Sequence, residues 1–167
     1  AKLTYKPILL GALFKTIGTP IVPLFEMTAP RQRYLRQDLE DWAKWWGVDF
    51  NFTPTFPLRT VTPLRVALQE PRCTHAVYKA AWVDGHNIGE PDVLKRVLDE
   101  AGFDGQALLE GTQDPDIKAQ LFSNTEEAIA RNVCGVPSLI VNQDIVFWGQ
   151  DRLSMVEGAL AGWVPKV

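Results

Sequence analysis

The sequence has 167 residues, of which 46% are hydrophobic and 22% are charged, and it carries a formal net charge of −3 at pH 7. A chain of this length and composition is expected to form one globular domain, or a small core with an insertion, without metal ions or disulfide bonds. The small negative charge gives no electrostatic basis for binding nucleic acid or an anionic membrane surface.

Cysteine and histidine usage disfavours further classes of protein. Cys73 and Cys134 are too few for a disulfide scaffold, and the sequence has no Cys-x-x-Cys pair, which disfavours a dithiol oxidoreductase. His75 and His86 lie in dissimilar contexts, so a histidine-based metal site is not expected. We find no signal-peptide pattern and no apolar run long enough to span a membrane, so we expect a cytoplasmic protein.

The first 47 residues predict a strand, a loop and a helix. Leu3 and Tyr5 alternate with polar residues ahead of Pro7, a pattern typical of a short strand. Glycine and prolines make residues 17–30 a loop. Residues 31–47 predict a helix that ends at its final glycine. The apolar face of this helix is formed by Leu35, Leu39, Trp42 and Trp46.

The middle of the chain predicts further helices. Residues 48–60, rich in proline and aromatic side chains, predict an extended crossing segment. Two helical pieces within residues 63–82 meet at Pro71, because proline is poorly tolerated inside a helix. Residues 90–102 carry proline near the first turn and a closing glycine, and therefore predict a helix. Residues 113–124 predict another.

The last 44 residues change in character. Asn124 and Glu127 form a capping box for a helix that ends near Arg131. The runs SLIVN and DIVFW are β-branched and aromatic, and the polar step between them predicts a β-hairpin. Asp151 is expected to cap a last helix. The apolar stripe of that helix is formed by Leu153, Val156 and Leu160. The order of elements indicates a sheet with a helical insertion.

Three stretches carry a resemblance: LLGALFKTIG, AAWVDGHNIGEPDVLKRVLDEAGFD and, above all, GVPSLIVNQDIVFWGQDRL. They resemble the 2-hydroxychromene-2-carboxylate isomerases, which group with kappa-class glutathione transferases and DsbA-like proteins in the thioredoxin-like superfamily. The resemblance implies an α/β fold with a thioredoxin-like (DsbA-type) sheet and a large all-helical insertion. The expected thioredoxin-like parts are residues 1–16 and 123–167, and residues 17–122 form the insertion.

The resemblance also implies a glutathione site. The peptide bond before the family's matching proline, here Pro137, is cis, and Val136 would offer its backbone N–H and C=O to the cysteinyl part of glutathione. Gln150 and Asp151 would hold the γ-glutamyl end, where helix-start N–H groups favour the carboxylate and the Asp carboxylate pairs with the ammonium. The alternative is that Asp151 is only an N-cap and that Val136 and Pro137 form only a turn.

Several positions depart from the family pattern. A loop Asn and the Lys of a Lys-x-x-Tyr step, which contact glutathione or substrate in the family, are replaced here by Thr19 and Arg31. Arg59 stands where many isomerases have an amide, and a solvated arginine is favoured over a substrate contact.

Arg31, Arg33 and Arg36 lie close together in the sequence, and a solvated helix face is favoured over an anion site.

Two departures concern nucleophiles. Cys134 replaces a residue that is usually aromatic, and a small buried thiol is favoured over a reactive one. The family's Ser-Pro-Tyr step, whose serine activates or positions the glutathione thiol, has no match in the sequence. Ser123, Ser138 and Ser154 do not take its place by motif.

Relative to the family, the chain is expected to be N-terminally truncated, since it lacks about 30 residues, roughly a strand, a loop and a helix. The absent strand would leave unpaired sheet edges. We therefore expect a homodimer or a higher oligomer, with strand exchange across the gap as one solution.

The resemblance implies a glutathione-dependent isomerase or transferase that acts on a small aromatic-derived substrate or ligand. In the family, the glutathione thiolate adds reversibly to an unsaturated aromatic-derived acid. The missing Ser-Pro-Tyr step implies impaired activity. The alternative hypothesis is a non-catalytic binding or assembly protein that has kept the fold.

Overall fold

A computed structural model describes residues 1–142 and 144–165 and divides the chain into two compact units. Unit 1 consists of Ala1–Ile21 and the residues from Phe122 onward, and unit 2 consists of Val22–Leu121. The sequence-based assignment of residues 1–16 and 123–167 to a thioredoxin-like part, and of residues 17–122 to an insertion, stays a prediction.

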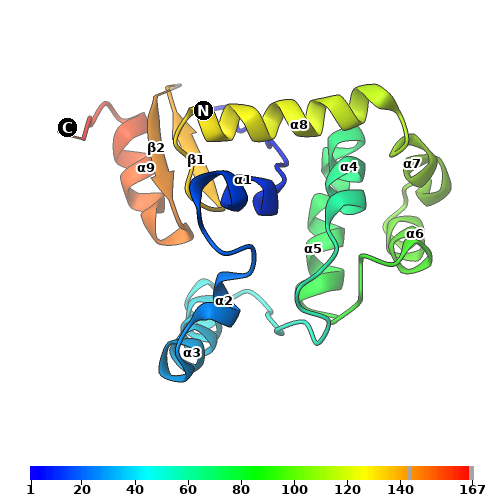
Figure 1. Cartoon of the computed structure of the whole chain (residues 1–167), viewed down its shortest axis with the longest axis horizontal. Helices are drawn as coiled ribbons and strands as arrows, with labels where there is room; N and C mark the ends of the chain where they lie inside the picture. The colour runs from blue at the N-terminus through cyan, green and yellow to red at the C-terminus, as the bar shows by residue number, and fades with distance from the viewer. Residues whose placement is uncertain (143, 166–167) are drawn as a thin grey trace. The chain divides into compact units, whose positions relative to one another are not determined.

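Among its described residues, unit 1 contains a two-stranded antiparallel sheet, three α-helical segments and a 3-10 turn (Figure 1). Its elements are α1 (Leu10–Ile17), the end of α8 (Pro115–Ala130), β1 (Ser138–Val141), β2 (Ile145–Trp148), the 3-10 turn η2 (Gln150–Arg152) and α9 (Leu153–Leu160). Ser138 lies opposite Trp148 and Val141 lies opposite Ile145. The predicted hairpin and the last helix are therefore confirmed.

The hairpin packs on α9. Val141 and Phe147 from the strands are buried together with Val156 and Ala159 from the helix. Of the predicted stripe on α9, Val156 is buried, whereas Leu153 and Leu160 are exposed. The face of α9 that meets the hairpin is therefore centred on Val156 and Ala159.

The strand expected at Leu3 to Tyr5 is wrong. Residues 1–9 have no regular secondary structure, and the side chains of Leu3 and Tyr5 are mostly exposed. A strand forms only where a neighbouring strand accepts its hydrogen bonds. In the part of the chain that the structure describes, the sheet holds only β1 and β2. The expected thioredoxin-like sheet is therefore reduced here to a hairpin.

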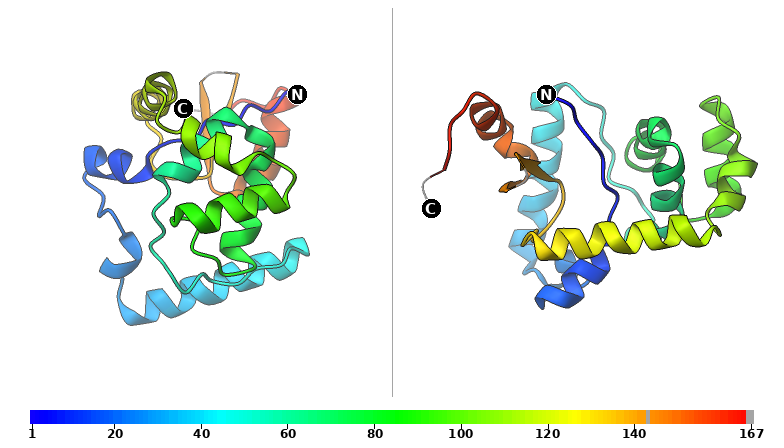
Figure 2. Two further views of the ribbon diagram at one scale, coloured as in Figure 1. Left: turned by 90° about the vertical axis from the view of Figure 1, so that its right-hand side faces the viewer. Right: turned by 90° about the horizontal axis from the view of Figure 1, so that it is seen from above.

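Instead of joining the sheet, the N-terminal segment runs to α8 (Figure 2). The Leu9 amide donates to Oγ1 of Thr125 over 2.9 Å, and Nδ2 of Asn124 donates to the Pro7 carbonyl over 3.1 Å. Lys6 pairs with Glu127. This ion pair, together with that to Arg131, holds the pKa of Glu127 below its ordinary value.

These contacts correct the capping box expected at Asn124. The helix is continuous from Pro115 to Ala130, so Asn124 lies in its interior and is only 6% exposed. The side-chain amide of Asn124 bonds to the carbonyl of Pro7 rather than to the start of a new helix. A tertiary acceptor has therefore replaced the local cap that the Asn-x-x-Glu spacing suggests.

Unit 2 is helical. Its elements are α2 (Pro23–Glu26), α3 (Ala29–Trp46), α4 (Val61–Gln69), the 3-10 turn η1 (Pro71–Cys73), α5 (Thr74–Trp82), α6 (Pro91–Glu100), α7 (Gly105–Gly111) and the first turns of α8. The predicted end of α3 at Gly47 (φ 65°) and the break at Pro71 are confirmed.

No helix among the described residues is both long and apolar enough to cross a membrane.

The core of unit 2 lies between α4, α5 and α6. Its buried side chains include Val66, Val77, Leu94 and Leu98. Two parts of the sequence prediction are incomplete. The expected loop at residues 17–30 contains α2 and the start of α3, and α7 was not predicted. The Asp104 carboxylate caps α7 by accepting from the Ala107 amide over 2.9 Å, a signal that the sequence carries.

Candidate functional site

The open end of the hairpin brings two predicted pieces of the site together. The Gly149 amide donates to the carbonyl of Pro137 over 3.0 Å, one step beyond the last strand pair, Ser138 and Trp148. Residues 136–137 therefore lie beside residues 149–151. We call these five residues the hairpin junction.

The first side of the hairpin junction presents backbone. The peptide bond between Val136 and Pro137 is cis, which confirms that part of the prediction. Val136 is 47% exposed, and neither its N–H nor its C=O has a hydrogen-bond partner among the described residues. An exposed residue with both backbone groups unpaired can accept an extended peptide as a further strand does.

The residue before Val136 is fixed by close packing. A Cβ atom on Gly135 would lie 2.5 Å from Nε1 and 2.7 Å from Cε2 of Trp148, so the indole ring lies directly against the glycine backbone. Oγ of Ser138 donates to the Gly135 carbonyl over 2.7 Å. These contacts hold the chain that leads into Val136.

The second side of the hairpin junction presents a helix start with charged side chains. Gly149 has φ 107° and ψ 149°, a conformation that is accessible only to glycine. Gln150 and Asp151 follow in η2 and are exposed. The carboxylate of Asp151 pairs with the guanidinium of Arg152, and the side chain of Asp151 lies against the Cα of Gly149.

The N-cap expected at Asp151 is wrong. No side chain caps η2 or α9, and the residue before η2 is Gly149. Because the Asp151 carboxylate pairs with Arg152 rather than with backbone N–H groups, it remains at the surface, where an external ammonium group can reach it.

Thr19 belongs to the same unit as the hairpin junction but to a different element. It follows α1 directly, after Gly18 in the left-handed conformation, and its amide donates to the Phe14 carbonyl over 2.9 Å. Among the described residues, no hydrogen bond joins Thr19 to the hairpin junction. Its predicted contact with glutathione stays a prediction.

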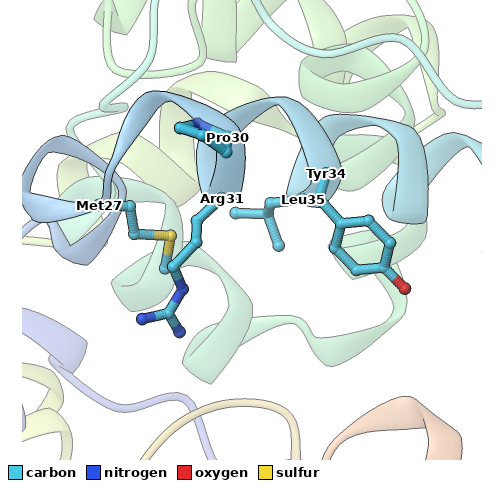
Figure 3. Close-up of a pocket in the computed structure, with 5 residues that line it drawn as sticks. All are labelled: Met27, Pro30, Arg31, Tyr34 and Leu35. Atoms are coloured by element: carbon cyan, nitrogen blue, oxygen red, sulfur yellow. The ribbon is translucent and has the colours of Figure 1, made fainter.

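Arg31 lies in unit 2, on the first turn of α3. It lines an open pocket of about 320 Å³ together with Met27, Pro30, Tyr34 and Leu35. Figure 3 shows the side chains of Met27 and Arg31 lying next to each other and that of Tyr34 pointing away from them. Tyr34 lines this pocket but was not predicted as a site residue. The spacing of Arg31 and Tyr34 matches the family's Lys-x-x-Tyr step, and this match could have pointed to Tyr34.

Arg59 shows no sign of a site. Its side chain is exposed, does not line the pocket beside Arg31 and forms no ion pair among the described residues. Its Cβ and its carbonyl oxygen lie close to Gly89. The solvated arginine favoured from the sequence agrees with this position.

The buried thiol expected at Cys134 is wrong, because Cys134 is exposed and Cys73 is the buried one. Val133, the residue before Cys134, is buried in the core with Leu13 and Ala128. Burial raises the pKa of the Cys73 thiol to about 11, with a smaller contribution from the charge of Glu70.

We expect one cysteine of the folded chain to react quickly with a thiol reagent at pH 8. With a pKa near 11, only about one Cys73 thiol in a thousand is ionised at that pH, and core side chains cover its sulfur. Cys134→Ser should remove the fast reaction, and denaturant should restore a second reactive thiol. Two thiols that react at equal rates in the folded chain would contradict this expectation.

Comparison with known proteins agrees with the resemblance read from the sequence. A family model described as DSBA-like thioredoxin domain matches residues 1–161. The chain is 27% identical over 135 residues to 2-hydroxychromene-2-carboxylate isomerase of Sphingobium xenophagum, which covers 78% of this chain and 69% of that protein. It is 29% identical over 133 residues to the protein of the same name from Pseudomonas sp. (strain C18), over 77% of this chain and 62% of that protein.

The fold agrees as well. A solved structure of 2-hydroxychromene-2-carboxylate isomerase matches with a TM-score of 0.79 at 23% identity, over 95% of this chain and 79% of that chain. The fold is thus that of a mostly helical DSBA-like thioredoxin domain, with a small two-stranded sheet in the described part of this chain.

Proposed function

This chain belongs to the DSBA-like thioredoxin domain family, and on that basis we propose that it binds glutathione at the hairpin junction. The observation that carries the proposal is the hydrogen bond between the Gly149 amide and the Pro137 carbonyl. It joins an unpaired backbone edge to a charged helix start, and glutathione has groups for both: a peptide backbone and a zwitterionic end.

The backbone edge suits the cysteinyl part of glutathione. The N–H and C=O of Val136 are unpaired among the described residues, so they can form the two hydrogen bonds of a short antiparallel pair. The indole of Trp148 against Gly135 keeps this edge in place before the ligand arrives. Such pre-organisation lowers the entropic cost of binding.

The helix start suits the γ-glutamyl end. The exposed carboxylate of Asp151 can pair with the ammonium group, and the Arg152 guanidinium beside it can pair with the carboxylate. Gln150 adds an amide that can donate and accept. An ammonium and a carboxylate on the same carbon atom thus find an anionic and a cationic side chain that are sequence neighbours.

Activity is a further step of the proposal. When bound, glutathione would supply a thiol nucleophile, and this chain's residues would hold and orient the tripeptide. We propose a protein similar to the glutathione-dependent isomerases and transferases. Ser138, the serine nearest to the hairpin junction, donates its hydroxyl hydrogen to the Gly135 carbonyl.

The alternative candidate function is a non-catalytic binding or assembly protein that has kept the fold. Turnover of an aromatic-derived substrate in the presence of glutathione would decide between the two. Glutathione contacts to Thr19 and Arg31, and a homodimer with strand exchange, stay predictions in either case.

The test of binding is a calorimetric titration of the 167-residue chain with glutathione. We expect saturable binding by the wild type and an affinity at least about tenfold lower in Asp151→Ala, because hydrogen bonds to charged groups are worth about 1.5–3 kcal/mol. Asp144→Ala is the matched control, since this exposed aspartate lies at the far end of the same hairpin.

No binding by the folded wild type at millimolar glutathione would reject the proposed site. Equal affinities of Asp151→Ala and the wild type would reject the role assigned to Asp151.

A further inference from the structure

Trp148 is a large aromatic residue beside the hairpin junction, and the proposed function gives it no contact with the ligand. It is the last residue of β2, directly before Gly149, and it is 56% exposed. Its partner in the strand register is Ser138, two residues after Val136. An indole ring that is half open to solvent next to an unpaired backbone edge can contact whatever binds along that edge.

The indole of Trp148 occupies the space that a side chain would take at residue 135. A Cβ on Gly135 would lie 2.5 Å from Nε1, 2.7 Å from Cε2 and 2.9 Å from Cζ2 of the ring. Gly135 is buried, and its φ is not in the left-handed region, so this glycine is required by the close contact and not by its backbone conformation. The ring therefore covers the chain immediately before Val136.

In the described part of the chain, the indole N–H of Trp148 has no hydrogen-bond acceptor. An indole N–H can only donate. A carboxylate is the strongest acceptor that a peptide ligand offers, because charge strengthens the hydrogen bond. A ligand carboxylate that reached the ring would therefore pair with a donor that the described residues leave open.

Strand direction decides which part of glutathione would meet this indole. In an antiparallel pair, the residue before Val136 lies opposite the residue after the cysteinyl residue of the ligand, and in glutathione that residue is glycine. Pro137, on the other side of Val136, is joined to Gly149 by a hydrogen bond of 3.0 Å. The γ-glutamyl end would thus lie on the side of Asp151, and the glycyl end on the side that the indole of Trp148 covers.

We propose that the indole N–H of Trp148 binds the glycyl carboxylate of glutathione, which makes Trp148 a specificity-determining residue. This role rests on the proposed function, because it follows from antiparallel pairing of the ligand with Val136. Each of the three residues of glutathione then has its own partner in unit 1: Asp151 for the γ-glutamyl residue, Val136 for the cysteinyl residue and Trp148 for the glycyl residue. The site would select tripeptides with a free C-terminal carboxylate.

Two ligands test this role by calorimetric titration of the 167-residue chain: glutathione and its glycyl ethyl ester, in which that carboxylate is neutral. We expect the wild type to bind glutathione at least about tenfold more tightly than the ester, because hydrogen bonds to charged groups are strong. Trp148→Phe keeps an aromatic ring on Gly135 and removes the N–H. It should reduce the preference for glutathione to less than about threefold, mainly through weaker binding of glutathione.

Two further variants separate the indole N–H from general effects of substitution. Gly135→Ala retains the indole but displaces it, because the added methyl group overlaps the ring, so it should also lose the preference. Trp163→Phe is the matched control. Trp163 belongs to the same unit, is 47% exposed and stacks on Phe147 with ring centroids 6.4 Å apart, so its substitution should keep the wild-type preference. The far-UV spectrum of each variant shows whether it is folded.

Three results would overturn the role of Trp148 and leave the proposed glutathione site in place. They are equal affinities of the wild type for the two ligands, a full preference for glutathione in folded Trp148→Phe, and an equal loss of preference in Trp163→Phe. A folded wild type that binds neither ligand at millimolar concentration would instead reject the hairpin junction as a glutathione site, and the role of Trp148 with it.

Discussion

Gly149→Ala is expected to weaken both glutathione binding and the folded chain. The backbone of Gly149, at φ 107° and ψ 149°, is in a region that side chains exclude, and occupying it costs an alanine about 1–3 kcal/mol. The added Cβ would also overlap the Asp151 carboxylate and displace it. We therefore expect a lower free energy of unfolding and a glutathione affinity reduced at least about tenfold.

Gly162→Ala is the matched control for this variant. Gly162 also has a positive φ, of 101°, but a Cβ there meets nothing within 4 Å. It should therefore lower the free energy of unfolding through the backbone alone and leave glutathione binding unchanged. Denaturant unfolding and calorimetry measure the two effects, and wild-type affinity in Gly149→Ala would contradict the geometry assigned to Asp151.

Leu98→Ala should have the largest effect on stability. Leu98, on α6, is fully buried at 0% exposed and packs in the core of unit 2 with residues of α4 and α5. Removing a fully buried leucine side chain to leave a cavity costs about 2–5 kcal/mol. Urea unfolding followed by circular dichroism should show a loss of this size.

Arg96→Ala controls for the change of residue on the same helix. Arg96 is exposed and faces Glu100 at 3.9 Å, a surface pair of little energetic weight. Its removal should change the free energy of unfolding by less than about 0.5 kcal/mol. A loss below about 1 kcal/mol in Leu98→Ala would show that the core of unit 2 is not packed as described.

Local signals in the sequence predicted those elements whose ends are set locally. Gly47 ends α3 because only glycine easily takes its left-handed conformation, and Pro71 separates α4 from α5 because it cannot continue a helix. The two apolar runs at residues 138–148 could form a hairpin with each other, so that prediction needed no distant partner.

Elements that depend on distant partners could not be predicted in this way. Leu3 and Tyr5 alternate as a strand does, yet their segment bonds to α8. Asn124 has the spacing of a helix cap, yet its side chain bonds to the Pro7 carbonyl, 117 residues away in sequence. The local pattern in each case is compatible with two structures, and a long-range contact selects between them.

The candidate site residues also differ in whether a local motif or only the folded structure identifies them. Pro137 and Asp151 were predicted from the family's motifs, and the hairpin register brings them together. A pocket of unit 2 that Phe25, Arg36 and Phe56 line has no sequence motif, since these residues come from three segments and meet only in the folded unit. From the sequence, Arg36 could only be read as part of a solvated helix face.

Glutathione binding at the hairpin junction is tested most directly by an amide-shift titration of the labelled chain with glutathione. We expect the amides of Val136, Gln150 and Asp151 to shift together and saturate with one Kd, while the amide of Leu98 in the core of unit 2 stays unchanged. Amides of the hairpin junction that do not move at millimolar glutathione, in a chain whose spectrum is that of a folded protein, would contradict it.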